Sequence, residues 1–315
     1  MFPGQSSRYP RMLERLSLLC PPTSAAVLDE ASDILHRDVR QQYRADNASI
    51  FACNRDVQVG VFLANHLCLR SLQASGIDAE LSLGLSLGEY NHLVHIDALT
   101  FADALPLVEA RGVIYDAGPD GAMVSVFPLE LDAMAEVVAR ASACGIVEIV
   151  SFNSPTQHVI AGERSAVDAA LAILEEEHFV DAVRIEDRIP MHSSVFAPVA
   201  MRFQHELERA SWCTPRRAYV PNVQGRPIAA PSVDFLVDAL TQHVCRPVLW
   251  RQSVETIAKC YSDTIFIEVG PRAILHNLLQ RTWLPCPRFK VDTEGDLLAD
   301  FASLLVDLEN GSERG

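Results

Sequence analysis

The chain has 315 residues, of which 49% are hydrophobic and 21% are charged, a composition typical of a soluble globular protein with a packed core. Its length exceeds the usual size of a single compact core, so we expect one large domain with a smaller domain inserted or appended. The formal net charge of −15 argues against nucleic-acid binding, because such binding needs a basic surface.

The sequence also predicts the cellular compartment. No stretch reaches the roughly 18 consecutive apolar residues of a membrane-spanning helix, and the first residues lack the charged and apolar segments of a signal peptide. We therefore expect a cytoplasmic protein. The eight cysteines are scattered singly without CxxC spacing, so we expect reduced thiols, no disulfides and no metal site.

Helical and strand signals alternate through most of the chain, which favours an α/β fold. Residues 56–74 carry apolar side chains at helical spacing. A short apolar strand, residues 81–83, leads directly into Gly84-Leu85-Ser86-Leu87-Gly88, and residues 89–94 begin another helix. We therefore expect a strand, a tight turn with a serine in it, and a helix.

The segment from about residue 121 to residue 187 predicts strands and helices in the order β-α-β-β-α-β, which is the ferredoxin-like pattern. The expected strands are 122–127, 147–152, 158–162 and 180–185, and the expected helices are 129–143 and 165–177. We therefore predict a large α/β-hydrolase-like domain with a parallel sheet, residues 1–120 and 188–315, and an inserted small ferredoxin-like domain, residues 121–187.

The GxSxG pattern at residues 84–88 indicates a nucleophilic serine. A serine at a sharp strand-to-helix turn needs glycines where side chains would clash, which makes Ser86 the candidate nucleophile. The amides at the start of the following helix can stabilise an oxyanion. An ordinary glycine-bounded turn has the same pattern, and the preceding strand favours the catalytic interpretation.

A serine nucleophile needs a base that takes its proton, and histidine is the usual one. His192 follows the small domain, at the expected edge of the cleft, and is the candidate base. His276 would serve instead if the protein were an α/β-hydrolase, in which the histidine comes last in the chain. The histidines on predicted helices are expected to be packing or surface residues: His66, His92 and His95.

Several further motifs resemble those of the malonyl-coenzyme A:acyl carrier protein transacylase family, which includes the discrete trans-acting acyltransferases of polyketide synthases. The resemblance covers nearly the whole chain, and its motifs follow the order of the family. They are Phe2-Pro3-Gly4-Gln5; Gln58; Gly84 to Tyr90; Ala104-Leu105 through Arg111-Gly112; Asn153-Ser154-Pro155 with Val159 to Gly162; Pro190-Met191-His192-Ser193; Asn222-Val223; Pro247 to Trp250; and Glu268-Val269-Gly270-Pro271.

The resemblance implies a ping-pong mechanism without a bound cofactor. Ser86, deprotonated by His192, would attack the thioester of an acyl-coenzyme A substrate, and the phosphopantetheine thiol of an acyl carrier protein would then take the acyl group. The family's oxyanion hole implies the backbone amides of Gln5 and Leu87. A backbone carbonyl late in the chain orients the histidine in this family, which implies His243, whose side chain would matter less than its main chain.

Arg111 bears on the substrate. A guanidinium pairs bidentately with a carboxylate, so an arginine in the acyl pocket would select malonyl or a related dicarboxylic acyl group, whereas the motif alone also fits a helix-surface arginine. The resemblance implies four further substrate-binding residues: Gln58, Leu85, Met191 and Asn153.

Several positions depart from the family pattern, among them Asn91, His92 and His95, which stand where small residues are typical. Leu85 replaces the usual histidine before the nucleophile, Met191 matches neither the malonyl nor the methylmalonyl pattern, and Arg272 replaces a glycine. These changes predict a specialised member of polyketide or antibiotic biosynthesis. The chain starts at the motif that normally follows the family's first strand, so we expect a few residues to precede Met1.

Alternatives to the transferase remain open. A hydrolase of the same fold, or a transferase of an unusual acyl group, would also use Ser86 and His192, but release of monocarboxylic chains gains nothing from a buried cation at Arg111. A non-catalytic docking protein predicts loss of the nucleophile or the base, and both are present. An α/β-hydrolase esterase rests on the GxSxG turn alone. A carrier protein, generally acidic, would need a basic patch on this acidic chain.

Overall fold

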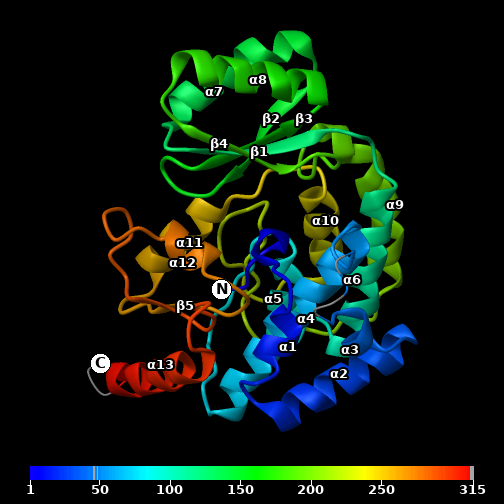
Figure 1. The fold of residues 1–315 in the computed structure, drawn as a ribbon, viewed down its shortest axis with the longest axis vertical. Helices are drawn as coiled ribbons and strands as arrows, with labels where there is room; N and C mark the ends of the chain where they lie inside the picture. Colours follow the sequence, from blue (N-terminus) through cyan, green and yellow to red (C-terminus); the bar gives the residue numbers. More distant parts are fainter. Residues whose placement is uncertain (45–46, 48, 313–315) are drawn as a thin grey trace.

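The computed structural model describes residues 1–44, 47 and 49–312. The chain forms two parts, a smaller one that contains a sheet and a larger, mainly helical one (Figure 1). A four-stranded sheet with two helices forms the upper part of the view, and a mainly helical body forms the lower part. The chain enters the sheet after residue 121 and returns to the helical body after residue 187. The mixed α/β class predicted from the sequence is therefore confirmed.

The sheet-containing part has the predicted β-α-β-β-α-β order. Its strands lie in the order β2-β3-β1-β4, all neighbours are antiparallel, and α7 and α8 cover one face (Figure 1). The elements are β1 (Ala122–Phe127), α7 (Leu131–Ala141), η2 (Ser142–Cys144), β2 (Val147–Phe152), β3 (His158–Gly162), α8 (Arg164–Glu177) and β4 (Asp181–Glu186). This part has its own cluster of buried apolar side chains, which supports our proposal that residues 121–187 are a domain.

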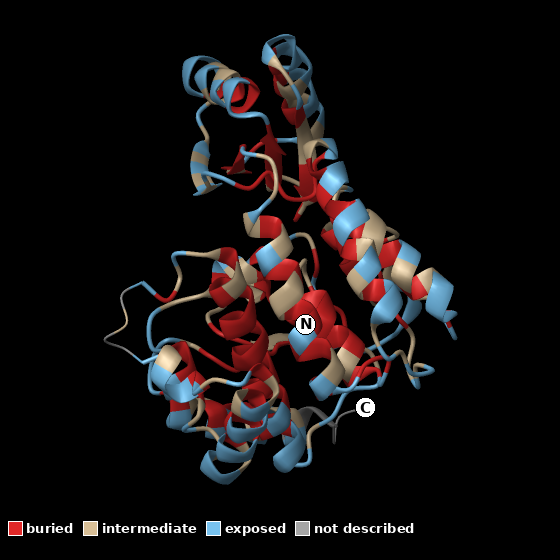
Figure 2. Cartoon of the chain, turned by 90° about the vertical axis from the view of Figure 1, so that its right-hand side faces the viewer, coloured by how far each residue is buried: buried red, intermediate tan, exposed pale blue. Residues whose placement is uncertain are grey.

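The helical body is organised around one buried helix, α4, which packs against α6 and α2 and is covered by exposed helices on the outside (Figure 2). The predicted helix at 56–74 is thus confirmed. The elements before the sheet are η1 (Gln5–Ser7), α1 (Met12–Leu16), α2 (Pro21–Leu35), α3 (Val39–Gln42), α4 (Asn54–Ala74), α5 (Gly88–His95) and α6 (Phe101–Asp116). None of the helices within the described residues is both long and apolar enough to span a bilayer.

The elements after the sheet return to the same body and complete its core. α9 packs along α10 and α6 and runs down the outer side of the body. The elements are η3 (Ser194–Phe196), α9 (Ala197–Arg209), α10 (Val233–His243), α11 (Trp250–Cys260), β5 (Phe266–Glu268), α12 (Ile274–Leu278), β6 (Arg288–Lys290) and α13 (Leu297–Ser312).

The parallel sheet of the body is small. β5 and β6 pair in parallel. The Met1 amino group donates to the Ile267 carbonyl of β5, and the Met1 carbonyl accepts from the Val269 amide. Phe2 forms an isolated parallel bridge with Gly84. The predicted strand at residues 81–83 is wrong. Among the described residues, the only ladder contact of this segment is the bridge between Gly84 and Phe2, in which Phe2 bonds to Leu83 and Leu85, and no strand pairing continues along residues 81–83. The turn with Ser86 therefore follows a single bridge rather than a regular strand.

Candidate active site

The turn at Ser86 is shaped by close contacts of backbone with backbone. A Cβ atom at Gly84 would lie 2.0 Å from the Gly88 carbonyl, and one at Gly88 would lie 2.1 Å from the carbonyl oxygen of Phe2. Ser86 itself has a φ of 51°, in the left-handed region that L-residues rarely adopt. The two glycines let the chain turn directly into α5, with Ser86 held in a strained conformation between them.

Asn222 holds this turn from the other side. Its side-chain oxygen accepts a hydrogen bond from the Ser86 amide at 2.8 Å, and its side-chain nitrogen donates to the Gly84 carbonyl at 2.6 Å. Asn222 is buried and its own amide donates to Glu89. From the sequence, Asn222 stands out only as part of a motif. The available signal was its residue type, because an asparagine side chain offers both a donor and an acceptor.

His192 lies beside Ser86 although the two are far apart in the sequence. The Ser86 Oγ and His192 Nε2 atoms are 2.9 Å apart, and His192 Nδ1 lies 2.7 Å from the carbonyl oxygen of His243. The His192 amide donates to the Val244 carbonyl at 3.0 Å, and its φ of 65° is left-handed like that of Ser86. A carbonyl can only accept, so Nδ1 carries the proton and Nε2 is free to accept one from Ser86.

The environment of His192 favours its neutral form. The ring is buried, and burial, followed by repulsion from His243 and Arg111, lowers the pKa of His192 well below its ordinary value of 6.5. The hydrogen bond to the His243 carbonyl acts weakly in the opposite direction. At neutral pH the imidazole is therefore unprotonated at Nε2, the state that a general base needs.

Two backbone amides in the region of Ser86, those of Gln5 and Leu87, donate no hydrogen bond to a backbone or side-chain acceptor within the described residues. Leu87 directly follows the serine at the start of α5, and Gln5 lines the same cavity as Ser86. Free donors beside a nucleophile can bind a developing oxyanion.

Arg111 is buried in α6. Its guanidinium donates to the side-chain oxygen of Gln58 at 2.6 Å and lies 4.3 Å from the ring centre of Tyr115 and 5.4 Å from that of Tyr90. Two of its nitrogens, Nε and Nη2, have no hydrogen-bond partner among the described residues. A buried cation with free donors can bind an anionic group.

A cavity of about 230 Å³ opens above Ser86 and His192. Its walls bring together four other predicted residues: Gln5, Leu85, Met191 and Asn153. Arg111 and Gln58 do not line it, although Arg111 is close enough to repel a proton on His192. The cavity thus joins four of the predicted residues to Ser86 and His192, whereas Arg111 and Gln58 form a buried pair outside its walls.

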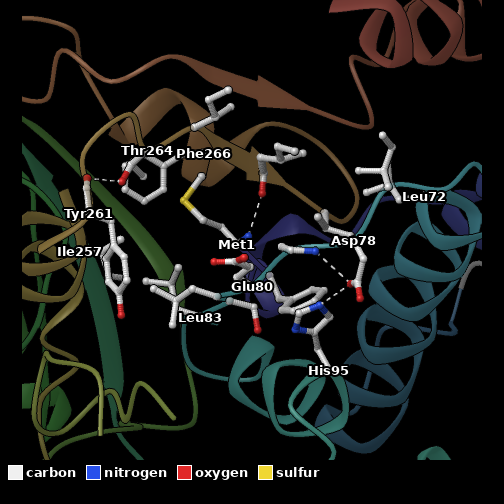
Figure 3. Close-up of a pocket in the computed structure, with 18 of the residues that line it drawn as sticks. Met1, Leu72, Asp78, Glu80, Leu83, His95, Ile257, Tyr261, Thr264 and Phe266 are labelled. Carbon is white, nitrogen blue, oxygen red and sulfur yellow. Dashed lines mark hydrogen bonds and ion pairs between the residues drawn. The ribbon is translucent and has the colours of Figure 1, made fainter. Parts of the chain in front are cut away.

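A separate cavity of about 360 Å³ lies beside Met1, and Figure 3 shows Asp78, His95, Tyr261 and Phe266 in its walls. It contains none of the predicted site residues. The alternative histidines lie away from Ser86: His66 stacks on Phe101, His92 bonds to Ser82, His95 to Asp78, and His276 to Asn277. Within the described part of the chain, no cluster of three or more His, Cys, Asp or Glu side chains suits a metal ion.

Comparisons with known proteins agree on one family. The model of the acyl transferase domain family matches residues 21–291. The malonyl CoA-acyl carrier protein transacylase of Escherichia coli (strain K12) is 31% identical over 285 residues, which are 89% of this chain and 91% of that protein.

Solved structures give the same result. The malonyl CoA-acyl carrier protein transacylase of Clostridium perfringens superposes with a TM-score of 0.89 at 28% identity, covering 99% of this chain and 98% of that one. A malonyl-transacylase in complex with its type II polyketide synthase acyl-carrier protein superposes with a TM-score of 0.86 at 28% identity and covers 98% of each chain.

Proposed function

Because this chain belongs to the acyl transferase family of malonyl-coenzyme A:acyl carrier protein transacylases, we propose that it transfers a malonyl group from coenzyme A to an acyl carrier protein through Ser86. The observation that carries the proposal is the contact of Ser86 Oγ with His192 Nε2 at 2.9 Å, with His192 Nδ1 bonded to the His243 carbonyl.

The first half-reaction forms an acyl-serine. His192 Nε2 takes the hydroxyl proton as Ser86 Oγ attacks the thioester carbon, a C–O bond forms, and a tetrahedral oxyanion results. As the intermediate collapses, the C–S bond breaks and the proton on His192 passes to the leaving coenzyme A sulfur. The second half-reaction is the reverse, with the phosphopantetheine thiol of the carrier as the attacking group.

The amides of Gln5 and Leu87 are our proposed oxyanion hole. Both lack an acceptor within the described residues, and one of them begins the helix that follows the nucleophile. An N–H without a protein partner can donate to the oxygen that becomes negative in the transition state. Removal of one such donor typically slows catalysis about 100-fold or more.

Arg111 is our proposed carboxylate site. The free nitrogens of its guanidinium and its position on two tyrosine rings would let it take a carboxylate bidentately while Gln58 keeps it oriented. Malonyl has this carboxylate and acetyl does not. Leu85, Met191 and Asn153 would line the acyl and pantetheine path through the cavity. A hydrolase of monocarboxylic chains has no use for this cation.

The carrier and the pathway extend this proposal. A structural relative is described in complex with a type II polyketide synthase acyl-carrier protein, and Leu85 and Met191 depart from the common family pattern, which supports a role in polyketide biosynthesis. The test is transfer from the labelled enzyme to purified holo carrier proteins of polyketide and fatty-acid type, with faster transfer to the polyketide carrier expected.

The direct test is the intact mass of the protein after brief incubation with malonyl-, methylmalonyl- and acetyl-coenzyme A. We expect one malonyl group on the parent protein, none on Ser86→Ala, and a loss of the preference for malonyl over acetyl in Arg111→Ala. Addition of holo acyl carrier protein should remove the label from the enzyme and place it on the carrier.

Two results would contradict the proposal. An unmodified parent protein would exclude the acyl-serine, and release of free malonate without label on the carrier would favour the hydrolase. If Arg111→Ala keeps the preference for malonyl, the arginine is structural and another group must select the acyl chain.

A further inference from the structure

The base His192 lies against a second buried histidine. The ring centres of His192 and His243 are 4.7 Å apart, and their planes are inclined by 23°, which is a stacked arrangement. The same His243 also supplies the carbonyl that accepts from His192 Nδ1. The side chain and the main chain of one residue therefore both touch the base.

The His243 ring also contacts a carboxylate, that of Glu89. His243 Nδ1 lies 2.7 Å from Glu89 Oε2, and both side chains are almost completely buried. The other oxygen, Glu89 Oε1, accepts from the Tyr219 hydroxyl and from the Asn222 amide. Glu89 Oε2 and His243 Nε2 have no hydrogen-bond partner of regular geometry among the described residues, so the 2.7 Å approach of Nδ1 to Oε2 is a close contact of the ion-pair type. A buried carboxylate is costly without a neighbour of this kind, so the contact ties the His243 ring to Glu89.

This contact is linked to the nucleophile as well as to the base. Glu89 lies in the first turn of α5, which follows Ser86, and it accepts from the Asn222 backbone amide, while the Asn222 side chain accepts from the Ser86 amide. The contacts thus run from Ser86 through Asn222, Glu89 and His243 to His192, and every member is buried except Ser86, which is partly buried.

We propose that the His243 side chain is a positioning residue for His192: held by its contact with Glu89, the His243 ring fixes the plane of the base by stacking on it. The inference rests on the proposed roles of Ser86 and His192. It assigns a function to the His243 imidazole in addition to that of its carbonyl.

The charges around His192 agree with this role. Among the described residues, Arg111 on α6 and His243 on α10 are the charged or titratable side chains that act on the His192 ring, and Glu89 on α5 contacts His243 in turn. Burial is the first cause that lowers the pKa of His192, and repulsion from His243 is the second, ahead of Arg111. Removal of the His243 ring should therefore raise the pKa of His192.

The test is His243→Gln, which keeps the main-chain carbonyl and an amide that can donate to Glu89 but removes the ring. The readout is the pH profile of Ser86 acylation by malonyl-coenzyme A, with kcat and KM measured separately. We expect the acid limb to move up by about one pH unit, kcat to fall about tenfold, and KM to stay near the parent value. The matched control is His205→Gln, an exposed histidine of α9, which should behave as the parent.

A folded His243→Gln protein with the parent's pH profile and kcat would overturn the inference while the acyl-serine proposal stands. A parent protein that forms no acyl-serine would overturn both. If His243→Gln does not fold, His243→Asn, which also keeps the main-chain carbonyl and removes the ring, replaces it with the same readouts. The parent's pH profile and kcat in that variant would overturn the inference.

Discussion

The two halves of the candidate site are held by different kinds of contact. The turn at Ser86 depends on backbone packed against backbone at Gly84 and Gly88, where an added methyl group would overlap carbonyl atoms. His192 instead depends on two carbonyl acceptors and on the ring of His243. Steric contacts of the first kind tolerate no substitution, whereas hydrogen bonds and charges can be altered by degrees. Substitutions at the turn of the nucleophile should therefore abolish acylation, whereas substitutions around the base should change its rate by degrees.

The strongest test of this comparison is Gly88→Ala. The new Cβ would lie 2.1 Å from the Phe2 carbonyl oxygen, so either the turn or the bridge to Phe2 must break. We expect a loss of about 3 kcal/mol or more in the free energy of unfolding, and no acylation of Ser86. Denaturant unfolding and intact mass measure the two effects.

The control for this variant is Gly295→Ala, whose Cβ would meet only side-chain oxygens of Asp300 and Thr293 at 3.1 Å or more. It should unfold within about 1 kcal/mol of the parent and be acylated normally. Normal acylation of Gly88→Ala would show that the turn can adjust, which would remove the contrast between the two halves.

A smaller effect is expected at Asn222, where a side chain supports the nucleophile. Asn222→Ala removes the acceptor of the Ser86 amide and the donor to the Gly84 carbonyl, and should reduce kcat about 10- to 100-fold and stability by about 2 kcal/mol. Asn222→Asp keeps the acceptor and loses the donor, so we expect it to lie between the parent and the alanine variant. Steady-state transfer kinetics would rank the three proteins, and equal rates would contradict a supporting role.

The smallest effect concerns the pH dependence of the parent protein. Because the pKa of His192 lies well below 6.5, the active neutral base is already fully present at pH 6.5, and a further rise in pH adds none. The acylation rate should stay flat from about pH 6.5 to 8 and decline only in more acid solution. A stopped-flow profile with an acid limb centred at or above pH 6.5 would show that the burial of His192 is relieved in solution.

Local sequence features predicted much of the fold. The elements between residues 121 and 187 and the helix at 56–74 are confirmed within a few residues, because their apolar spacing and glycine or proline breaks are local properties. The prediction of a strand at 81–83 was wrong because this apolar run pairs with a neighbouring segment, among the described residues, only at the bridge between Gly84 and Phe2, which is too short to form a ladder. A strand depends on its neighbours, which a local pattern does not contain.

The family motifs identified Ser86, His192 and Arg111 as candidates, but not the geometry that joins them. From the sequence, we assigned His243 a carbonyl alone and assigned no role to Glu89 or Asn222. Both are polar residues inside motifs, Glu89 directly after Gly88 and Asn222 between Pro221 and Val223, and polar groups need partners when they are buried. Which partners they find depends on chain segments that approach only after folding.

By itself, the sequence determined the family, the α/β class, the order of elements in the small sheet, and the turn in which Ser86 is placed between two glycines. Those features follow from local backbone chemistry and from motifs that keep their order along the chain. Only the tertiary structure decided that His192 and His243 stack, that Glu89 contacts His243, and that Arg111 is buried with two nitrogens that have no partner among the described residues. Such contacts join residues more than 50 positions apart, so they depend on how packed segments meet.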